Sequence, residues 1–511
     1  MALDAGRFLH PLFARLVRWE AQRIVRRFHR SLADPRHTQL RVLLEKLRRN
    51  ADSDFGRRCS IAAVRSIEDF RRAVPITTYA DYEPFIDRVR HGDSGAMFGP
   101  GQKLHMFAMT SGTAGRPKYI PVTGHFLREY RRGWMTWGIQ AFLDHSEAFE
   151  SRILQLVSPM DDETAPCGLP CGAMSGLTAH VQRKGARNIY VIPPAVARLK
   201  NTAQKYYVAL LLALRCPRLI ILSANPSTLL GLARALDEDK ESLLRDLRDS
   251  RVSDSLDLPP DIRREIQRRL RPASRRVAEL ERHVVADGAL LPRAAWQIPF
   301  LGCWKGGTLS LYLREFPRYF GGAVVRDIGL IASEGRMTVP LGDEGSAGVL
   351  DLESNFFEFV PARDGRRADD RALLPHELEV GGEYFLLITN SAGLYRYDIG
   401  DVVAWSTGRA TCPGWSSSTR APTTPASPAR NCPSTRWWRP LTVPWPTAAR
   451  DSRPMRWPPS GPRTHPTTCS SPNRATWRPA RPRASPPPWT PFSPASMSST
   501  IPNVPADGSR P

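Results

Sequence analysis

The spacing of apolar positions divides the chain into segments of different period. Through residues 1–90, apolar side chains recur every three or four positions, which predicts a mainly helical N-terminal part. From about 104 to 225, β-rich runs such as LHMFAMT and RLIILSA alternate with helical stretches such as TAQKYYVALLLALR. That rhythm is typical of an α/β domain. Residues 226–290 are charged with a helical period, and residues 296–403 return to strands and turns.

The periodic pattern ends at Val403. Up to that residue, the stretch YRYDIGDVV alternates large, charged and β-branched side chains, whereas Ala404–Pro511 shows no period. This tail holds 24 of the 47 prolines and 8 of the 13 tryptophans, with no lysine or glutamate. Proline at that density removes backbone donors and prevents helices and sheet ladders. We therefore expect a folded domain over residues 1–403 and a disordered tail over residues 404–511.

The tail also dominates the charge balance. It carries 14 arginines against two aspartates, so it supplies +12 of the formal net charge of +22 and leaves +10 on residues 1–403. A strongly basic chain raises the question of a nucleic acid or an anionic membrane as partner. In the body, however, the basic runs at 23–30 and 263–276 have apolar residues at helical spacing, which is typical of helices with a solvated basic face. We expect no specific nucleic-acid partner.

Cysteine use and hydropathy favour a reduced, cytoplasmic setting. The pair Cys167 and Cys171 has no second pair or histidine cluster to complete a zinc site, and the other cysteines are scattered. The N-terminus lacks the apolar core and the small-residue cleavage site of a signal peptide. The longest apolar run, YYVALLLAL, is too short to span a bilayer. We expect a cytoplasmic monomer without a transmembrane segment.

Three short motifs carry the candidate chemistry, and the first is MTSGTAGRPKYIPVT at residues 109–123. It packs two hydroxyls, two glycines and a lysine into the eight residues from Ser111 to Lys118. Glycines let backbone amides turn inward, hydroxyls donate to phosphate oxygens, and a lysine adds positive charge. This loop favours a triphosphate rather than an ordinary Gly/Ser turn, although it is not a Walker A loop because Arg116 and Pro117 precede the lysine. The candidate phosphate-binding residues are Ser111, Gly112, Thr113, Gly115 and Lys118.

The second motif, GLIASEGRMTVPL, places Glu334 between Ser333 and Gly335 in a short turn after an apolar segment. A carboxylate at such a turn can face a cleft and bind Mg²⁺ through one or two oxygens. A solvated glutamate in an exposed turn is the alternative interpretation of this motif alone.

The third motif is YRYDIGD, residues 395–401. Its spacing predicts a strand with Tyr395 and Tyr397 on one face. Gly400 then turns the chain so that Asp401 can accept hydrogen bonds from vicinal hydroxyls, as acidic residues do from a ribose. Taken alone, a strand that ends in an Asp-capped turn explains the same residues.

Together the three motifs resemble those of the GH3 family of acyl-acid amido synthetases, within the adenylate-forming superfamily. The resemblance extends to three further segments, FRRAVPITTYADYEPFIDRVRHGD, CGLPCGAMSG and LGCWKGGTLSLY, and covers nearly everything from about Phe70 to Val403. It implies a large α/β domain in which β-sheets and barrel-like strands are flanked by helices. Leu330 stands where relatives place an aromatic residue that stacks on adenine.

The resemblance implies an ATP-dependent, Mg²⁺-dependent ligase that works in two steps. A carboxylic acid attacks the α-phosphate of ATP to give an acyl-adenylate and pyrophosphate, and an amino acid or other amine then attacks the acyl carbon and releases AMP. By position, Ser111, Thr113, Gly115 and Lys118 hold the phosphates. Glu334 binds Mg²⁺ and acts with Lys118 in catalysis, Ser333 and Tyr397 line the nucleotide site, and Asp401 binds the ribose. An acyl-CoA or aryl-CoA ligase and a non-catalytic nucleotide-binding module remain as alternatives.

The genetic code offers an explanation for the abnormal tail. In this family a smaller C-terminal domain follows the third motif, and here the composition changes instead at Ala404. If the reading frame slipped by one base, the adjacent codons of Trp437 and Trp438 contain a valine codon in the original frame. Residues 427–440 can then be reread as a sequence with a helical pattern and carboxylates. We therefore expect residues 404–511 to be an out-of-frame product that replaces the C-terminal domain. The chain as written is expected to have weak or no activity.

Overall fold

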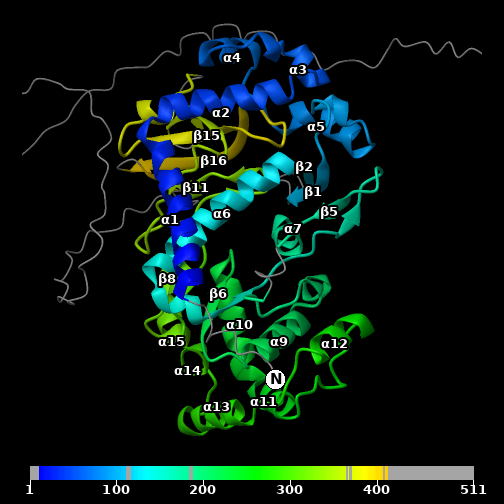
Figure 1. The fold of residues 1–511 in the computed structure, drawn as a ribbon, viewed down its shortest axis with the longest axis vertical. Helices are drawn as coiled ribbons and strands as arrows, with labels where there is room; N and C mark the ends of the chain where they lie inside the picture. Colours follow the sequence, from blue (N-terminus) through cyan, green and yellow to red (C-terminus); the bar gives the residue numbers. More distant parts are fainter. Residues whose placement is uncertain are drawn as a thin grey trace, which may run out of the picture. The chain divides into compact units, whose positions relative to one another are not determined.

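Helices form the N-terminal part of the computed structural model, as the apolar period predicted (Figure 1). The structure describes residues 11–110, 117–182, 188–363, 366–367, 371–406 and 409–411. The N-terminal helices are α1 (Pro11–Ala33), α2 (Pro35–Arg49), α3 (Asp54–Arg58), α4 (Ile67–Ala73) and α5 (Tyr79–Arg90), with short 3-10 turns η1 (Ile61–Ala63) and η2 (Ser94–Ala96). Local capping explains where two of them begin. Asp34 accepts a hydrogen bond from the amide of His37 at the start of α2, and Ser66 and Asp69 form a capping box on α4.

A mixed four-stranded sheet in the order β2-β1-β5-β4 follows these helices. Its strands are β1 (Leu104–Thr110), β2 (Lys118–Thr123), β4 (Glu163–Thr164) and β5 (Pro170–Gly172). β1 and β2 are antiparallel and their register pairs Thr110 with Lys118. The first motif therefore connects the ends of this hairpin, and residues 111–116 lie outside the described residues. The side chain of Thr123 caps α6 (Gly124–Asp144), which follows β2 directly.

A second four-stranded sheet, in the order β3-β6-β7-β8, is entirely parallel. Its strands are β3 (Arg152–Gln155), β6 (Leu219–Leu222), β7 (Phe300–Gly302) and β8 (Val324–Arg326). All four residues of β6 are buried, which agrees with the continuous apolar runs typical of parallel strands. The helices and 3-10 turns around these strands are η3 (Ser146–Glu150), α7 (Met174–His180), η4 (Pro194–Arg198), α9 (Thr202–Ala213), α10 (Pro226–Glu238), α11 (Lys240–Arg248), α12 (Pro260–Gln267), α13 (Ser274–Asp287), α14 (Pro292–Ala295), η5 (Gly307–Glu315) and α15 (Phe316–Phe320). The predicted α/β class is confirmed.

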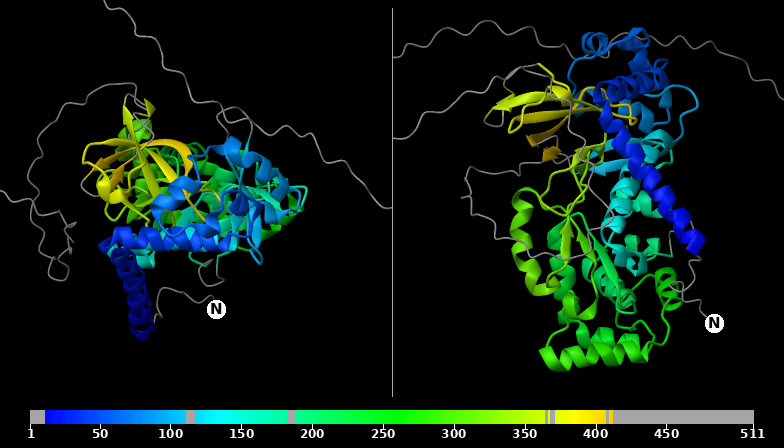
Figure 2. Two further views of the ribbon diagram at one scale, coloured as in Figure 1. Left: turned by 90° about the horizontal axis from the view of Figure 1, so that it is seen from above. Right: turned by 60° about the vertical axis from the view of Figure 1, so that its left-hand side comes forward.

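Short hairpins and an antiparallel sheet complete the described chain. The hairpin strands are β9 (Ile331–Ala332), β10 (Gly335–Arg336), β11 (Thr338–Val339) and β12 (Val349–Leu350). The antiparallel sheet, in the order β14-β13-β15-β16-β17, contains β13 (Phe356–Arg363), β14 (Arg366–Arg367), β15 (Glu383–Thr389), β16 (Tyr397–Ser406) and β17 (Arg409–Thr411), with η6 (Pro375–Glu377) before β15. α2 packs on this sheet, where Gln39 accepts a hydrogen bond from the backbone amide of Phe357 in β13. α1 lies beside α6 in Figure 1 and in the right-hand view of Figure 2.

Two large apolar cores hold these layers together. One core joins the N-terminal helices, the β1–β2 hairpin and the antiparallel sheet, with Phe107, Phe356 and Tyr395 at its centre. The other surrounds the parallel sheet and its helices. A smaller cluster around Trp137 of α6 and Phe300 of β7 connects α6 to the parallel sheet. The first core encloses the segments that carry the second and third motifs, so packing rather than local turn chemistry fixes their positions.

The folded chain extends beyond the boundary predicted at Val403. β16 continues to Ser406, Trp405 is buried in the first core, and β17 ends at Thr411. The rest of the predicted tail, from residue 412, lies outside the described residues. None of the helices in the described part of the chain is both long and apolar enough to cross a membrane.

Candidate functional site

Glu334 occupies the tight turn of the β9–β10 hairpin. Ala332 pairs with Gly335 across the hairpin, so Ser333 and Glu334 form the two-residue turn. Glu334 is only 6% exposed, although it lies in a turn. Burial raises the pKa of Glu334 because it removes water from the carboxylate, while the nearby charge of Lys118 opposes that shift. The buried setting disfavours the interpretation of Glu334 as a solvated turn residue.

Tyr397, the first residue of β16, faces the Glu334 carboxylate. The Tyr397 hydroxyl donates a long hydrogen bond of 3.4 Å to Glu334 Oε1. Burial, and then the negative charge of Glu334, raise the pKa of Tyr397, so the hydroxyl keeps its proton at neutral pH. Tyr397 therefore orients the carboxylate as a neutral donor.

Lys118 begins β2 and approaches the same carboxylate from another sheet. Its Nζ lies 5.6 Å from the centroid of the Tyr79 ring, at the first residue of α5. The Tyr79 hydroxyl accepts a hydrogen bond of 2.9 Å from the backbone amide of Tyr119, the residue after the lysine. Tyr79 thus ties the start of β2 to α5 and limits where the lysine side chain can reach.

Replacement of Tyr79 by phenylalanine should therefore lower the free energy of unfolding by about 1 kcal/mol, because the Tyr119 amide loses its acceptor while the ring remains. Urea denaturation followed by circular dichroism measures this change. Tyr312→Phe, at an exposed position of η5, is the matched control and should leave the midpoint unchanged. Equal midpoints for Tyr79→Phe and the wild type would contradict the assignment of this bond.

Asp401 lies within an irregularity in the pairing of β15 with β16. Phe385 pairs with Val402 and Leu387 with Asp398, so extra residues bulge out of β16 between those pairs. Gly400, at φ +83°, makes the turn, and its amide donates 2.8 Å to the side chain of Asp398. Such bulges redirect side chains out of a ladder. Burial, and then the charge of Asp398, raise the pKa of Asp401.

The expectation that Tyr395 and Tyr397 share one strand face is wrong. Arg396 between them has φ +47°, in the left-handed region that residues other than glycine rarely adopt, and β16 begins only at Tyr397. The physical reason is the buried guanidinium of Arg396, which donates 2.9 Å to Glu358 and 2.9 Å to the carbonyl of Val74. This charge pairing overrides the strand periodicity.

Asn390 is a site residue that the motif analysis missed. Its Nδ2 donates 2.7 Å to the carbonyl oxygen of Glu334, and its Oδ1 accepts from the amides of Ala392 and Leu394. The available signal was a polar residue directly after the apolar strand run YFLLIT. That signal does not reveal the partner, which lies 56 residues earlier in the chain.

The structure thus brings together four of the residues chosen from sequence, which are Lys118, Glu334, Tyr397 and Asp401, because Lys118 and Asp401 both act electrostatically on Glu334. The hydroxyl of Ser333 lies 3.5 Å from the carbonyl of Met109 near the end of β1. The other predicted phosphate-binding residues, Ser111, Gly112, Thr113 and Gly115, lie outside the described residues.

The donor set of this site fits a magnesium nucleotide better than a resident metal. Within the described residues, no group of three or more His, Cys, Asp or Glu side chains is arranged to hold a metal ion. Mg²⁺ in nucleotide sites is commonly held by one or two carboxylates together with substrate phosphates and water. Glu334 and Asp401 supply carboxylates, and the single long bond from Tyr397 leaves oxygen lone pairs of Glu334 for a cation.

A pocket of about 670 Å³ lies away from these residues, among side chains of α1, α2 and α6. Its arginines and carboxylates largely neutralise one another, as in the 3.0 Å pair of Arg27 with Glu353. No residue of the candidate site lines this pocket, so the chemistry of the motifs belongs to the Glu334 region.

Comparisons with known proteins agree with the motifs. The model of the GH3 family N-terminal domain matches residues 24–325, and the model of the GH3 family central domain matches residues 348–417. A probable indole-3-acetic acid-amido synthetase of Oryza sativa subsp. japonica is 25% identical over 397 residues, which cover 71% of this chain and 62% of the relative. A jasmonoyl-L-amino acid synthetase of the same plant is 24% identical over 412 residues, covering 74% and 69%. This chain therefore spans about two thirds of the length of these relatives.

Solved structures show the same fold. A GH3.15 acyl acid amido synthetase has a TM-score of 0.66 at 21% identity, over 76% of this chain and 70% of the other. A second structure of that synthetase, in complex with 2,4-DB, has a TM-score of 0.68 at 20% identity, over 77% and 70%. At this level of identity the likeness establishes the architecture, while the family models account for more than half of the chain.

Proposed function

This chain belongs to the GH3 family, and we propose that it derives from an ATP-dependent ligase that joins a small carboxylic acid to an amino acid or other amine through an acyl-adenylate. The convergence of Lys118, Glu334, Tyr397 and Asp401 carries this proposal. These groups are a cation, two carboxylates and a neutral donor, which suit the phosphates, the metal and the ribose of a magnesium nucleotide. The amido synthetase names of the relatives support the same reaction class.

In the first step, the carboxylate oxygen of the acid forms a bond to the α-phosphorus of ATP, and the bond to the pyrophosphate leaving group breaks. Lys118 neutralises charge that shifts onto the phosphate oxygens, together with the loop that precedes it. Asp401 accepts hydrogen bonds from the ribose hydroxyls and so fixes the position of the nucleotide relative to Lys118. No side chain has to act as a nucleophile in this step.

Glu334 holds the magnesium ion that accompanies the triphosphate, and Tyr397 keeps the carboxylate pointing towards it. When bound, Mg²⁺ supplies charge neutralisation at the phosphates. The buried position of Glu334 makes its ionised form unfavourable without a cation, so the site favours the metal-loaded state. In the second step, the amine nitrogen attacks the acyl carbon and AMP leaves.

The sequence after the third motif limits what this exact chain can do. We infer that its tail is an out-of-frame product, and that the lid which excludes water and completes the site in adenylating enzymes is lost with the displaced domain. Weak or absent turnover is the expected result, in a cytoplasmic monomer. Sequencing the DNA from codon 402 to codon 417, where the match to the central-domain model ends, tests this inference, because an unchanged reading frame through that stretch would overturn it.

Calorimetric titration with ATP, with and without Mg²⁺, tests the nucleotide site directly. We expect Mg²⁺-dependent binding, and we expect Asp401→Asn to weaken it by about tenfold through the loss of a charged acceptor. ATP–pyrophosphate exchange with a panel of carboxylic acids then measures the first step. Binding without exchange, together with a partner that depends on the tail, would favour a nucleotide-binding module. Thioester formation with CoA would favour an acyl-CoA ligase, and the absence of Mg²⁺-dependent binding would sink the proposal.

A further inference from the structure

Two buried asparagines hold the main chain at Glu334 and two residues after it. Asn390 Nδ2 donates 2.7 Å to the carbonyl of Glu334 itself, and Asn355 Nδ2 donates 2.8 Å to the carbonyl of Arg336. Both asparagines are almost completely inaccessible to solvent. The turn that presents the Glu334 carboxylate, and strand β10 that follows it, are therefore held by side-chain amides from the antiparallel sheet region.

Asn355 is held in turn by Gln39 of α2. Gln39 Nε2 donates 2.8 Å to the carbonyl of Asn355 and 2.9 Å to the carbonyl of Leu352, while its Oε1 accepts 2.7 Å from the amide of Phe357. A single buried side chain of α2 thus uses both ends of its amide to fix the segment that carries Asn355.

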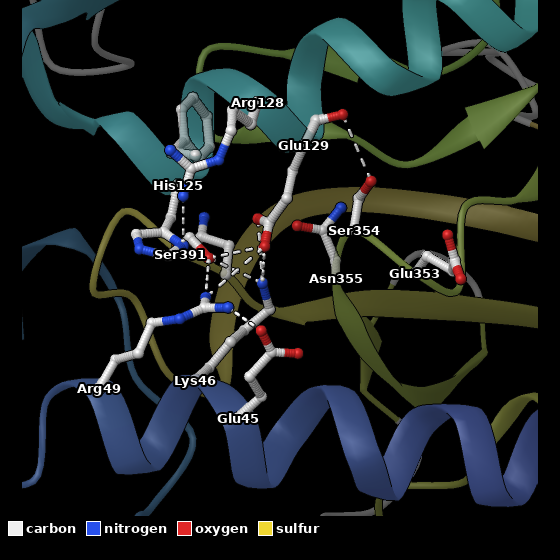
Figure 3. Close-up of polar contacts among 12 residues, drawn as sticks. Glu45, Lys46, Arg49, His125, Arg128, Glu129, Glu353, Ser354, Asn355 and Ser391 are labelled. Atoms are coloured by element: carbon white, nitrogen blue, oxygen red, sulfur yellow. Dashed lines mark hydrogen bonds and ion pairs between the residues drawn. The ribbon is translucent and has the colours of Figure 1, made fainter.

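Asn390 is held through its neighbour Ser391, again by α2. Lys46 Nζ donates 2.9 Å to the Ser391 hydroxyl and 2.9 Å to Glu129 Oε1 of α6, and the Ser391 hydroxyl donates 2.9 Å to the same Glu129 oxygen. Figure 3 shows Lys46 and Glu129 converging on Ser391 from their two helices. Lys46 is buried, and a buried ammonium is favourable only when it is paired in this way.

We propose that α2 is a positioning element for the metal-binding carboxylate, acting through Lys46–Ser391–Asn390 on the carbonyl of Glu334 and through Gln39–Asn355 on the carbonyl of Arg336. The inference rests on the proposed role of Glu334 and goes beyond it, because both asparagines donate to the main chain and not to the carboxylate. Hydrogen bonds that orient a metal ligand from outside the coordination sphere typically raise metal affinity by about 10–100-fold.

Asn390→Asp is the sharpest test. It retains the Oδ1 acceptor for Ala392 and Leu394 but loses the donor to the Glu334 carbonyl. An added negative charge near Glu334 would by itself strengthen attraction for a cation, whereas lost positioning weakens binding, so the two effects have opposite signs. We expect the Mg²⁺ concentration that half-saturates ATP binding to rise about tenfold, measured by calorimetry at fixed ATP.

A matched control separates positioning from general destabilisation. Tyr207→Phe removes a buried 2.9 Å hydrogen bond to Asp246 between α9 and α11, in the other core, and should leave the Mg²⁺ dependence unchanged. Ser391→Ala is a milder change in the same chain of contacts and should raise the half-saturating Mg²⁺ concentration by a smaller factor. It replaces Asn390→Asp as the test variant if Asn390→Asp does not fold.

Hydrogen exchange of the ligand-free chain gives a readout that does not require nucleotide binding. Amides of residues 333–336 should exchange faster in Asn390→Asp and Ser391→Ala than in the wild type, and at the wild-type rate in Tyr207→Phe. Wild-type Mg²⁺ dependence and wild-type exchange in both variants would overturn the inference and leave the proposed function intact. A wild-type chain without Mg²⁺-dependent ATP binding would remove the proposed function and, with it, the positioning role.

Discussion

Glu358→Gln should lower the free energy of unfolding by roughly 3 kcal/mol, because it removes the counter-charge of the buried Arg396 and of the partly buried Arg71. The Glu358 side chain is 1% exposed, and its two oxygens accept 2.8 Å from Arg71 Nε and 2.9 Å from Arg396 Nε. Glutamine has the same shape but no charge, and only one of its two terminal atoms can accept. Urea unfolding followed by circular dichroism measures the loss.

Glu353→Gln is the matched control for that prediction. Glu353 pairs with Arg27 at 3.0 Å and more weakly with Arg41 at 3.8 Å and Arg132 at 3.7 Å. The Arg27 side chain is 62% exposed and the other two are partly exposed, so solvent screens these pairs. Removal of the Glu353 charge should cost less than about 1 kcal/mol. If both substitutions lowered stability equally, the Glu358 pair would not be the buried charge cluster described above, and the left-handed conformation of Arg396 would need another cause.

Glu334→Gln should abolish the Mg²⁺ dependence of ATP binding and, at the same time, raise the melting temperature of the ligand-free chain by about 2 °C. The pKa of Glu334 in the folded chain lies above its ordinary value, mainly because of burial. The folded chain therefore binds this proton more tightly than the unfolded chain, and wild-type stability falls as pH rises through the interval between the two pKa values. Glutamine does not ionise, so the variant does not lose this stability as the pH rises.

The pH dependence distinguishes this explanation from a general packing effect. The difference in melting temperature between Glu334→Gln and the wild type should be small at about pH 4 and larger at about pH 7.5, because burial raises the pKa of Glu334 and stability is lost as the pH rises above the ordinary pKa of a glutamate. Differential scanning calorimetry without nucleotide measures both points. A variant that melts below the wild type at the higher pH, or that keeps the wild-type Mg²⁺ response, would contradict the role given to this carboxylate.

The spacing of apolar residues alone was sufficient to predict whether most segments form helices or strands. The fully buried run of β6 and the helices of the first 90 residues follow directly from side-chain spacing, since a core-facing stripe or a buried strand leaves a strong local signal. The motifs also led to the family, which the family models confirm. Both results depend on information within short windows of sequence.

The details of the site depend on partners far apart in the chain, which no local pattern contains. The left-handed turn at Arg396 arises from a carboxylate 38 residues earlier, and the Tyr397–Glu334 contact spans 63 residues. Asn390 carries no family motif, and its partner is a backbone carbonyl that any residue could supply. The strand end predicted at Val403 was too early because Trp405, although it belongs to a tryptophan-rich stretch, is large enough to fill the first core.

The segment before α5 has a consequence for how the protein is made. Thr77 forms a parallel bridge with Tyr397: its amide donates to the carbonyl of Arg396, and its carbonyl accepts from the amide of Asp398. The third motif is therefore completed by chain synthesised some three hundred residues earlier, and a nascent polypeptide cannot close this contact until residue 398 has left the ribosome. Closure of so long a loop is slow, so the amide and carbonyl of Thr77 lack these partners until the loop closes. Because every partner in this closure precedes Val403, this contact does not depend on the reading frame after that residue.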